Sequence, residues 1–229
     1  MQNLRWSSPP TPAILPPFAT HFGRTLVDRA TAWAIVGGLS KPGKMPWWSY
    51  SIPATRCKVG SKLAKIPGTV CHGCYALKGN YNFPNVQDAM ERRLASLSDP
   101  RWVDAMIFLL RDLSRGKARH FRWHDSGDLQ NPSHLHKIVK VAKATPHIQH
   151  WLPTKEKGIV LKYATPIPSN LTIRISAYHL DTTIDGDGFP TSAVSTTTST
   201  CPAYTQGGKC LDCRRCWDAT VPLVTYPKH

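Results

Sequence analysis

The sequence predicts an α/β fold, namely a partial (β/α) barrel with mostly parallel strands and a C-terminal cysteine-rich metal-binding extension. Strand-like and helix-like segments alternate along the chain, which favours a parallel sheet with right-handed crossovers. Polar clusters follow the expected strands, where parallel sheets place their chemistry. Four of the seven cysteines fall between residues 201 and 216. These observations indicate a barrel that presents metal ligands.

The chain divides into three expected parts. Residues 1–24 are a Pro-rich arm, 25–196 the partial barrel, and 197–229 the cysteine-rich extension with the C-terminal tail. At 229 residues with 41% hydrophobic composition, the chain is long and apolar enough to bury a core. One domain of ordinary size, or a domain with a small metal-bound appendage, is therefore expected.

The first elements are read from periodicity and from the residues that end them. Apolar residues recur at helical spacing over 25–36, and Gly37 supplies a left-handed C-terminal cap. An aromatic-rich strand is expected at 47–52, stopped by Pro53. The basic segment that follows, which carries three cysteines, is expected to be a loop.

The remaining elements continue the alternation. Amphipathic stripes predict helices at 85–97, 101–114, 132–144 and 156–164. β-Branched and aromatic runs predict strands at 119–124, 147–152 and 171–176. Residues 181–200 are rich in Gly, Ser and Thr and predict a loop or a short edge strand at 192–196. The tail at 221–226 supplies a last strand.

Polar side chains stand where the expected strands end. Asp125-Ser-Gly-Asp128 follows one strand, Thr154 and Lys155 follow the next, and Arg174 and Ser176 close another. His124, Asp125 and Asp128 are either acid–base groups or parts of a hydrogen-bonded turn, and the sequence leaves both open.

The C-terminal cysteines give the strongest signal. Their C-x2-C-x2-C run is typical of ligands to a [4Fe–4S] cluster, with structural zinc as the alternative metal. The ligands would be Cys201, Cys210, Cys213 and Cys216. Lys209, Arg214 and Arg215 would offset thiolate charge. An odd cysteine count argues against a disulfide framework and for a reducing compartment.

The upstream cysteines form a second group, Cys57, Cys71 and Cys74. Three thiolates suit an iron–sulfur cluster, and three thiolates with a histidine such as His72 equally suit zinc. A single site that mixes ligands from both groups also stays open.

The net charge of +15 favours a polyanionic partner, most simply nucleic acid, although the basic residues are spread out and also fit a generally basic surface. No apolar run has the length of a membrane span, and the N-terminus lacks the pattern of a signal peptide. A cytoplasmic protein without a membrane partner is expected.

Four segments carry a family resemblance. The chain is similar to the phage gene product 88-like proteins in CHGCYALKGNY (71–81), FRWHDSGDLQ (121–130), HWLPTKEKG (150–158) and GGKCLDCRRCW (207–217). A phage-encoded protein would act in the host cytoplasm. The order of elements in turn resembles radical-SAM proteins, whose partial barrels carry a three-cysteine loop after the first strand.

The radical-SAM resemblance implies roles for particular residues. The group Cys57, Cys71 and Cys74 would hold a [4Fe–4S] cluster whose open iron binds S-adenosylmethionine, and a reductant protein would be a partner. The cosubstrate's methionine end and ribose would contact Gly127, Asp128, Arg174 and Ser176. The C-terminal cysteines would resemble auxiliary-cluster extensions. The spacing here is C-x13-C-x2-C rather than the familiar C-x3-C-x2-C, and a ten-residue insertion can be looped out.

Two hypotheses from different classes follow. The first is a radical-type enzyme that reductively cleaves S-adenosylmethionine. The second is a non-catalytic iron–sulfur or zinc protein that transfers electrons or binds nucleic acid, its metal stabilising the fold.

Overall fold

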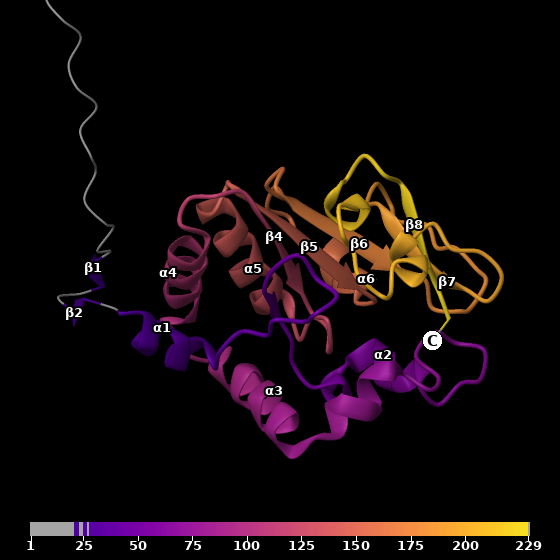
Figure 1. Cartoon of the computed structure of the whole chain (residues 1–229), viewed down its shortest axis with the longest axis horizontal. Helices are drawn as coiled ribbons and strands as arrows, with labels where there is room; N and C mark the ends of the chain where they lie inside the picture. The colour runs from indigo at the N-terminus through magenta and orange to yellow at the C-terminus, as the bar shows by residue number, and fades with distance from the viewer. Residues whose placement is uncertain (1–20, 23–24, 27, 229) are drawn as a thin grey trace, which may run out of the picture.

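A computed structural model describes residues 21–22, 25–26 and 28–228 (Figure 1). Apart from residues 21–22, the arm expected at 1–24 lies outside the described residues. The short strands β1 (His21–Phe22) and β2 (Thr25–Leu26) pair in antiparallel fashion before the main fold begins.

One six-stranded sheet organises the fold. Its strands are β3 (Ser49–Tyr50), β4 (Arg119–Trp123), β5 (Ile148–Thr154), β6 (Leu171–Ser176), β7 (Thr191–Ser195) and β8 (Leu223–Pro227). All neighbouring pairs are parallel, and their order in the sheet follows their order in the chain. The predicted parallel α/β fold is confirmed. The tail supplies β8, so the sheet includes residues from the cysteine-rich extension.

The observed bounds of the main helices are close to those predicted from the apolar periodicity of the sequence. They are α1 (Arg29–Val36), α3 (Pro84–Ser96), α4 (Trp102–Ser114), α5 (Pro132–Ala144) and α6 (Lys157–Leu161). None of the helices within the described residues is both long and apolar enough to cross a membrane.

The start of the first helix differs from the prediction. We expected a helix over 25–36, but α1 begins at Arg29 because Asp28 caps it: its carboxylate accepts the Thr31 N–H at 2.7 Å. The expected end is confirmed, since Gly37 follows with a φ of 74°.

Two strand predictions were wrong in detail. We expected β5 to stop before Pro153, but the strand runs through it to Thr154, with Pro153 aligned to Arg174 of β6. We expected at most an edge strand near 192–196, but β7 lies inside the sheet because the tail returns as β8 and pairs beside it.

A helix also stands where a loop was expected. The six-residue helix α2 (Lys58–Leu63) follows Cys57 directly. The Val59 N–H, in the first turn of α2, has no partner within the helix and donates instead to the Glu156 carboxylate at 2.8 Å. This partner comes from a distant part of the chain, so no local signal predicts the helix.

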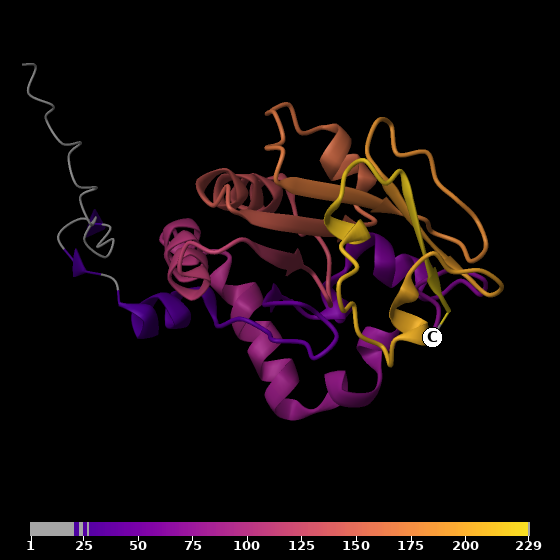
Figure 2. The same ribbon diagram turned by 45° about the horizontal axis from the view of Figure 1, so that its top comes forward.

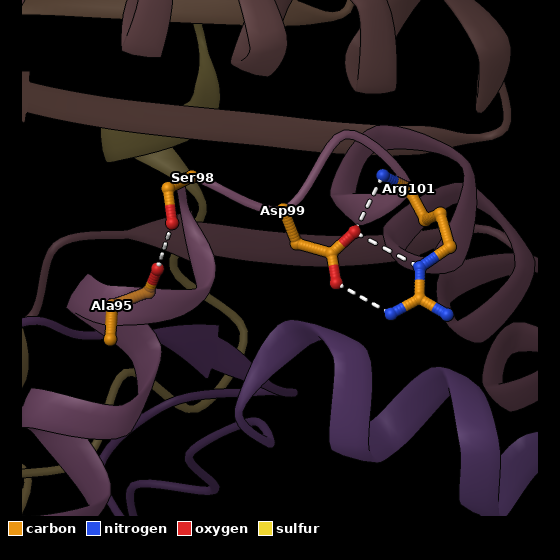
Figure 3. A network of polar contacts seen from close by, with 4 residues as sticks. All are labelled: Ala95, Ser98, Asp99 and Arg101. Atoms are coloured by element: carbon orange, nitrogen blue, oxygen red, sulfur yellow. Dashed lines mark hydrogen bonds and ion pairs between the residues drawn. The ribbon is translucent and has the colours of Figure 1, made fainter.

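The turn between α3 and α4 is fixed by polar contacts (Figure 3). The Asp99 carboxylate accepts from the Arg101 backbone N–H at 2.8 Å and from its guanidinium at 3.1 and 2.8 Å. These bonds lower the pKa of Asp99. The Ser98 hydroxyl donates to the Ala95 carbonyl at 2.8 Å. The turn therefore holds the two helices at a defined junction.

The two faces of the sheet have different coverings, because side chains alternate along each strand. The larger core joins the sheet to the helices through residues such as Phe121, Trp123 and Ile173. A second, smaller core joins Trp151 and Val224 to the C-terminal extension. Figures 1 and 2 place α4 and α5 at one side of the molecule and the yellow C-terminal segment at the other.

Candidate cysteine sites

The carboxyl ends of β4 and β5 are joined through one buried carboxylate. Asp128 accepts from the Thr154 hydroxyl at 2.6 Å and from the backbone N–H groups of Leu129 and Lys155 at 2.7 and 2.8 Å. Burial raises the pKa of Asp128 to about 6, although these hydrogen bonds act in the opposite direction and lower it. The polar clusters that follow β4 and β5 therefore meet at this edge of the sheet, whereas Arg174 and Ser176 of β6 have other partners.

The first cysteine group lies at this edge. Cys57 precedes α2, and the sulfur atoms of Cys57 and Cys71 lie 3.7 and 3.5 Å from the point where a Cβ on Gly60 would stand. Both sulfurs are therefore within 4 Å of one point. Burial raises the pKa of the Cys57 thiol, and the nearby charges of Asp128, Cys71 and Cys74 raise it further. The three cysteines are thus electrostatic neighbours.

Charged side chains surround this first group. Glu156 is only 6% exposed and also raises the pKa of the Cys57 thiol. Burial raises the pKa of the Cys71 thiol, while the positive charge of Lys155 lowers it. Two carboxylates and one ammonium group therefore lie beside three thiols.

Backbone pairing brings the Cys71 loop to the sheet. The Val70 N–H donates to the Tyr178 carbonyl, and the Leu180 N–H donates to the Gly68 carbonyl, both at 2.9 Å. Thr69 and His179 form an antiparallel bridge. Since Tyr178 follows β6, these bonds carry Cys71 toward the carboxyl end of that strand.

The second cysteine group, Cys201, Cys210, Cys213 and Cys216, lies on the face of the sheet that the main helices do not cover. Cys216 is buried beside Trp151 and Trp217, and its sulfur lies 3.1 Å from the Tyr226 hydroxyl oxygen. Burial raises the pKa of Cys216 to about 11, and the charge of Cys201 adds to the shift.

Cys210 belongs to the same neighbourhood. Burial raises the pKa of its thiol, and the charges of Cys201 and Cys213 add to the shift. Arg214 lowers the pKa of Cys210, in the role expected for that residue. The charges of the C-terminal cysteines therefore influence one another across this neighbourhood.

Arg122 on β4 lies between the two groups and was missed by sequence reasoning. Its guanidinium carbon is 4.5 Å from the centroid of the Trp151 ring. Burial lowers its pKa, but the nearby Tyr75, Asp125, Tyr226 and Tyr81 together raise it above its ordinary value. The same cation lowers the pKa of Cys210. Its position between Phe121 and Trp123, which face the helices, was the signal that it points the other way.

The thiols are neighbours without forming a closed metal site. Within residues 21–22, 25–26 and 28–228, no three His, Cys, Asp or Glu side chains converge as ligands of a metal ion would. The structure brings the predicted ligands into two neighbourhoods, and metal binding at each of them stays a prediction.

Gly127 and Ser176 have structural partners. Gly127 has a φ of 80°, and a Cβ on it would overlap the side chain and carbonyl of Ile52. The Ser176 hydroxyl lies 3.1 Å from the Ser192 hydroxyl.

Arg174 holds the extension on the sheet. Its Nε and two terminal nitrogens donate at 2.7–3.1 Å to the backbone carbonyls of Thr191, Arg215, Cys216, Asp218 and Val221. A guanidinium has five N–H donors, and all are used here. The resemblance implied that Arg174 contacts a cosubstrate, but no N–H remains for that contact.

His124 is buried with His134 rather than exposed as an acid–base group. It is 3% exposed, has a φ of 54°, and its ring centroid is 5.1 Å from that of His134. Burial lowers the pKa of His124 well below its ordinary value and that of His134 to about 3. Both rings are therefore neutral near pH 7.

A family model described as Gene product 88 matches residues 25–219. The chain belongs to the gene product 88 family. Neither a curated protein nor a solved structure matches it significantly. The radical-SAM resemblance has no support from these comparisons.

The gene product 88 match spans both cysteine groups, from Cys57 to Cys216, and every strand of the main sheet except β8. The two cysteine neighbourhoods and the parallel sheet that holds them therefore lie within the part of the chain that defines its family membership.

Proposed function

We propose that this gene product 88 protein is an iron–sulfur protein in which Cys57, Cys71 and Cys74 hold a [4Fe–4S] cluster. The observation that carries the proposal is that these thiols are neighbours near the carboxyl end of a parallel sheet, although thirteen residues separate the first two. In a cubane each thiolate binds a different iron, so neighbouring sulfurs that border a volume suit this group.

The charges around the thiols support a bound cation. Three thiolates beside Asp128 and Glu156 would place five negative charges close together, and the positive charge of Lys155 opposes them at Cys71. Burial penalises such charges unless they are paired or coordinate a metal. A cluster or a zinc ion would satisfy the thiolates, and iron is our choice for both cysteine groups, with zinc as the competing metal.

The sheet also fits the proposal. Six parallel strands in chain order are the arrangement of a partial (β/α) barrel, the form expected of radical-SAM proteins. When bound, a reduced cluster of that type supplies the electron that cleaves S-adenosylmethionine.

The residues assigned to S-adenosylmethionine do not fit it. Arg174 has no remaining donor, and the Asp128 carboxylate already accepts three hydrogen bonds within the chain. We derive no catalytic step through the cosubstrate. Of the two proposed functions, the site therefore better supports the non-catalytic one, an iron–sulfur protein that exchanges electrons with a reductant protein.

The experiment is electron paramagnetic resonance of the dithionite-reduced, anaerobically purified protein, with and without S-adenosylmethionine. We expect a reduced-cluster signal that the cosubstrate leaves unchanged. A signal altered by S-adenosylmethionine, with release of 5′-deoxyadenosine, would overturn the non-catalytic form. The absence of any cluster signal in iron-loaded protein would overturn the cluster itself.

A further inference from the structure

A pocket of about 360 Å³ opens beside Cys74, and no cysteine lines it. Its lining residues are Gly73, Tyr75, Lys78, Gly79, Asn80 and Tyr81. The two tyrosine rings are in edge contact, with centroids 5.9 Å apart. The pocket thus combines aromatic rings with an amide and an ammonium group.

The tyrosines are held from behind by the end of β4. The Tyr75 hydroxyl donates to the Asp125 carbonyl at 2.6 Å, and the Tyr81 hydroxyl lies 3.5 Å from the Asp125 carboxylate. Asp125 is itself fixed by the Ser49 hydroxyl at 2.7 Å. The rings are therefore positioned before any ligand arrives, which lowers the entropy cost of binding.

The segment around the pocket is basic in its own sequence, and the carboxylates that approach it, Glu156 at α2 and Asp125 behind the tyrosines, come from other parts of the chain. No Asp or Glu occurs between residues 29 and 87. Four exposed lysines, Lys58, Lys62, Lys65 and Lys78, have no ion-pair partner among the described residues. A polyanion would therefore meet cations whose charge is not already neutralised.

Exposed apolar side chains gather in the same segment. Four of the seven large exposed apolar side chains in the described part of the chain belong to it: Ile66, Tyr75, Leu77 and Phe83. Exposed aromatic rings interleaved with lysines are the features with which proteins bind unpaired bases and their phosphates.

We propose that this tyrosine surface, meaning the pocket at Tyr75 and Tyr81 with Lys58, Lys62, Lys65 and Lys78, binds single-stranded nucleic acid. A base occupies the pocket against the tyrosine rings, the Asn80 amide meets the polar edge of the base, and the lysines track the phosphates. Duplex is excluded from the pocket because its bases are stacked and paired. The inference goes beyond the proposed cluster and does not depend on it.

The test is fluorescence anisotropy of the full-length protein with a labelled oligothymidylate, across a range of salt concentrations. Tyr75→Leu should weaken binding by about 5- to 150-fold, the loss expected for one base–aromatic stack. Tyr75→Phe keeps the ring and should bind nearly as the wild type does. Circular dichroism checks that both variants are folded.

Charge variants supply a second, independent readout. Replacing Lys58, Lys62 and Lys65 by Gln should lower the slope of log affinity against log salt by about 2, since each phosphate contact contributes about 0.7. The matched control replaces exposed Lys117, Lys140 and Lys143, which lie after α4 and on α5, and should leave the slope unchanged.

Three outcomes would overturn the proposal: no binding at low salt, binding to duplex as tight as to the single strand, or equal loss in the two lysine variants. Because the cluster is read by spectroscopy and not by anisotropy, failure of this proposal is distinguishable from failure of the cluster.

Discussion

Replacing Cys57 with alanine is expected to remove the iron and sulfide of one cubane, about four of each per chain. The thiol is one of three neighbouring thiols near the carboxyl end of the sheet, and a cubane that loses one of three protein ligands should be released. The side chain of Cys57 makes no capping hydrogen bond to α2, so the helix should persist. Iron and sulfide assays on anaerobically purified variants measure the loss.

The matched variant is Cys213→Ala in the second group. It should remove only the metal of that group and leave the first cluster in place. If Cys57→Ala and Cys213→Ala each removed all of the metal, the two groups would form one mixed site. If only one of the two variants removed it, only that group would hold a metal. If Cys57→Ala kept its full iron and sulfide, the assignment of the first group would be wrong.

Replacing Arg174 with methionine is expected to lower the free energy of unfolding by about 3–5 kcal/mol. Methionine keeps much of the apolar stem but supplies no donor to the five carbonyls that Arg174 now binds. Each buried carbonyl left without a partner costs about 1–3 kcal/mol, and local rearrangement recovers part of the sum. Urea unfolding measures the change.

Arg101→Met is the control for the Arg174 variant. It removes an arginine that binds Asp99 at the surface, with the Arg101 side chain 60% exposed, and should cost at most about 1 kcal/mol. An Arg174→Met protein as stable as the wild type would show that the extension is held by its apolar contacts alone.

Strong local signals explain what the sequence predicted correctly. The helices α3, α4 and α5 have unbroken apolar stripes, and the strands β4 and β6 have β-favouring residues bounded by turns, so each was placed to within one or two residues. The parallel sheet followed from the alternation of strands and helices, whereas the two cysteine groups stay predicted metal sites.

What the sequence did not predict depends on partners that are distant in the chain. The helix α2 begins against Glu156, and β7 became an interior strand only because the tail pairs beside it. Arg174 looked like a ligand contact because it stands at a strand end, yet its partners lie seventeen or more residues further along the chain. For Arg122 the only sequence signal was its place between two apolar residues of a strand, which indicates its face of the sheet but not its neighbours.

The most direct test of the cluster assignment is the iron, zinc and acid-labile sulfide content per chain of protein purified without oxygen. We predict iron and sulfide in equal amounts, about four of each for every cysteine group that carries a cubane and about eight of each when both do. Zinc without sulfide would contradict the account, because zinc sites contain no inorganic sulfide.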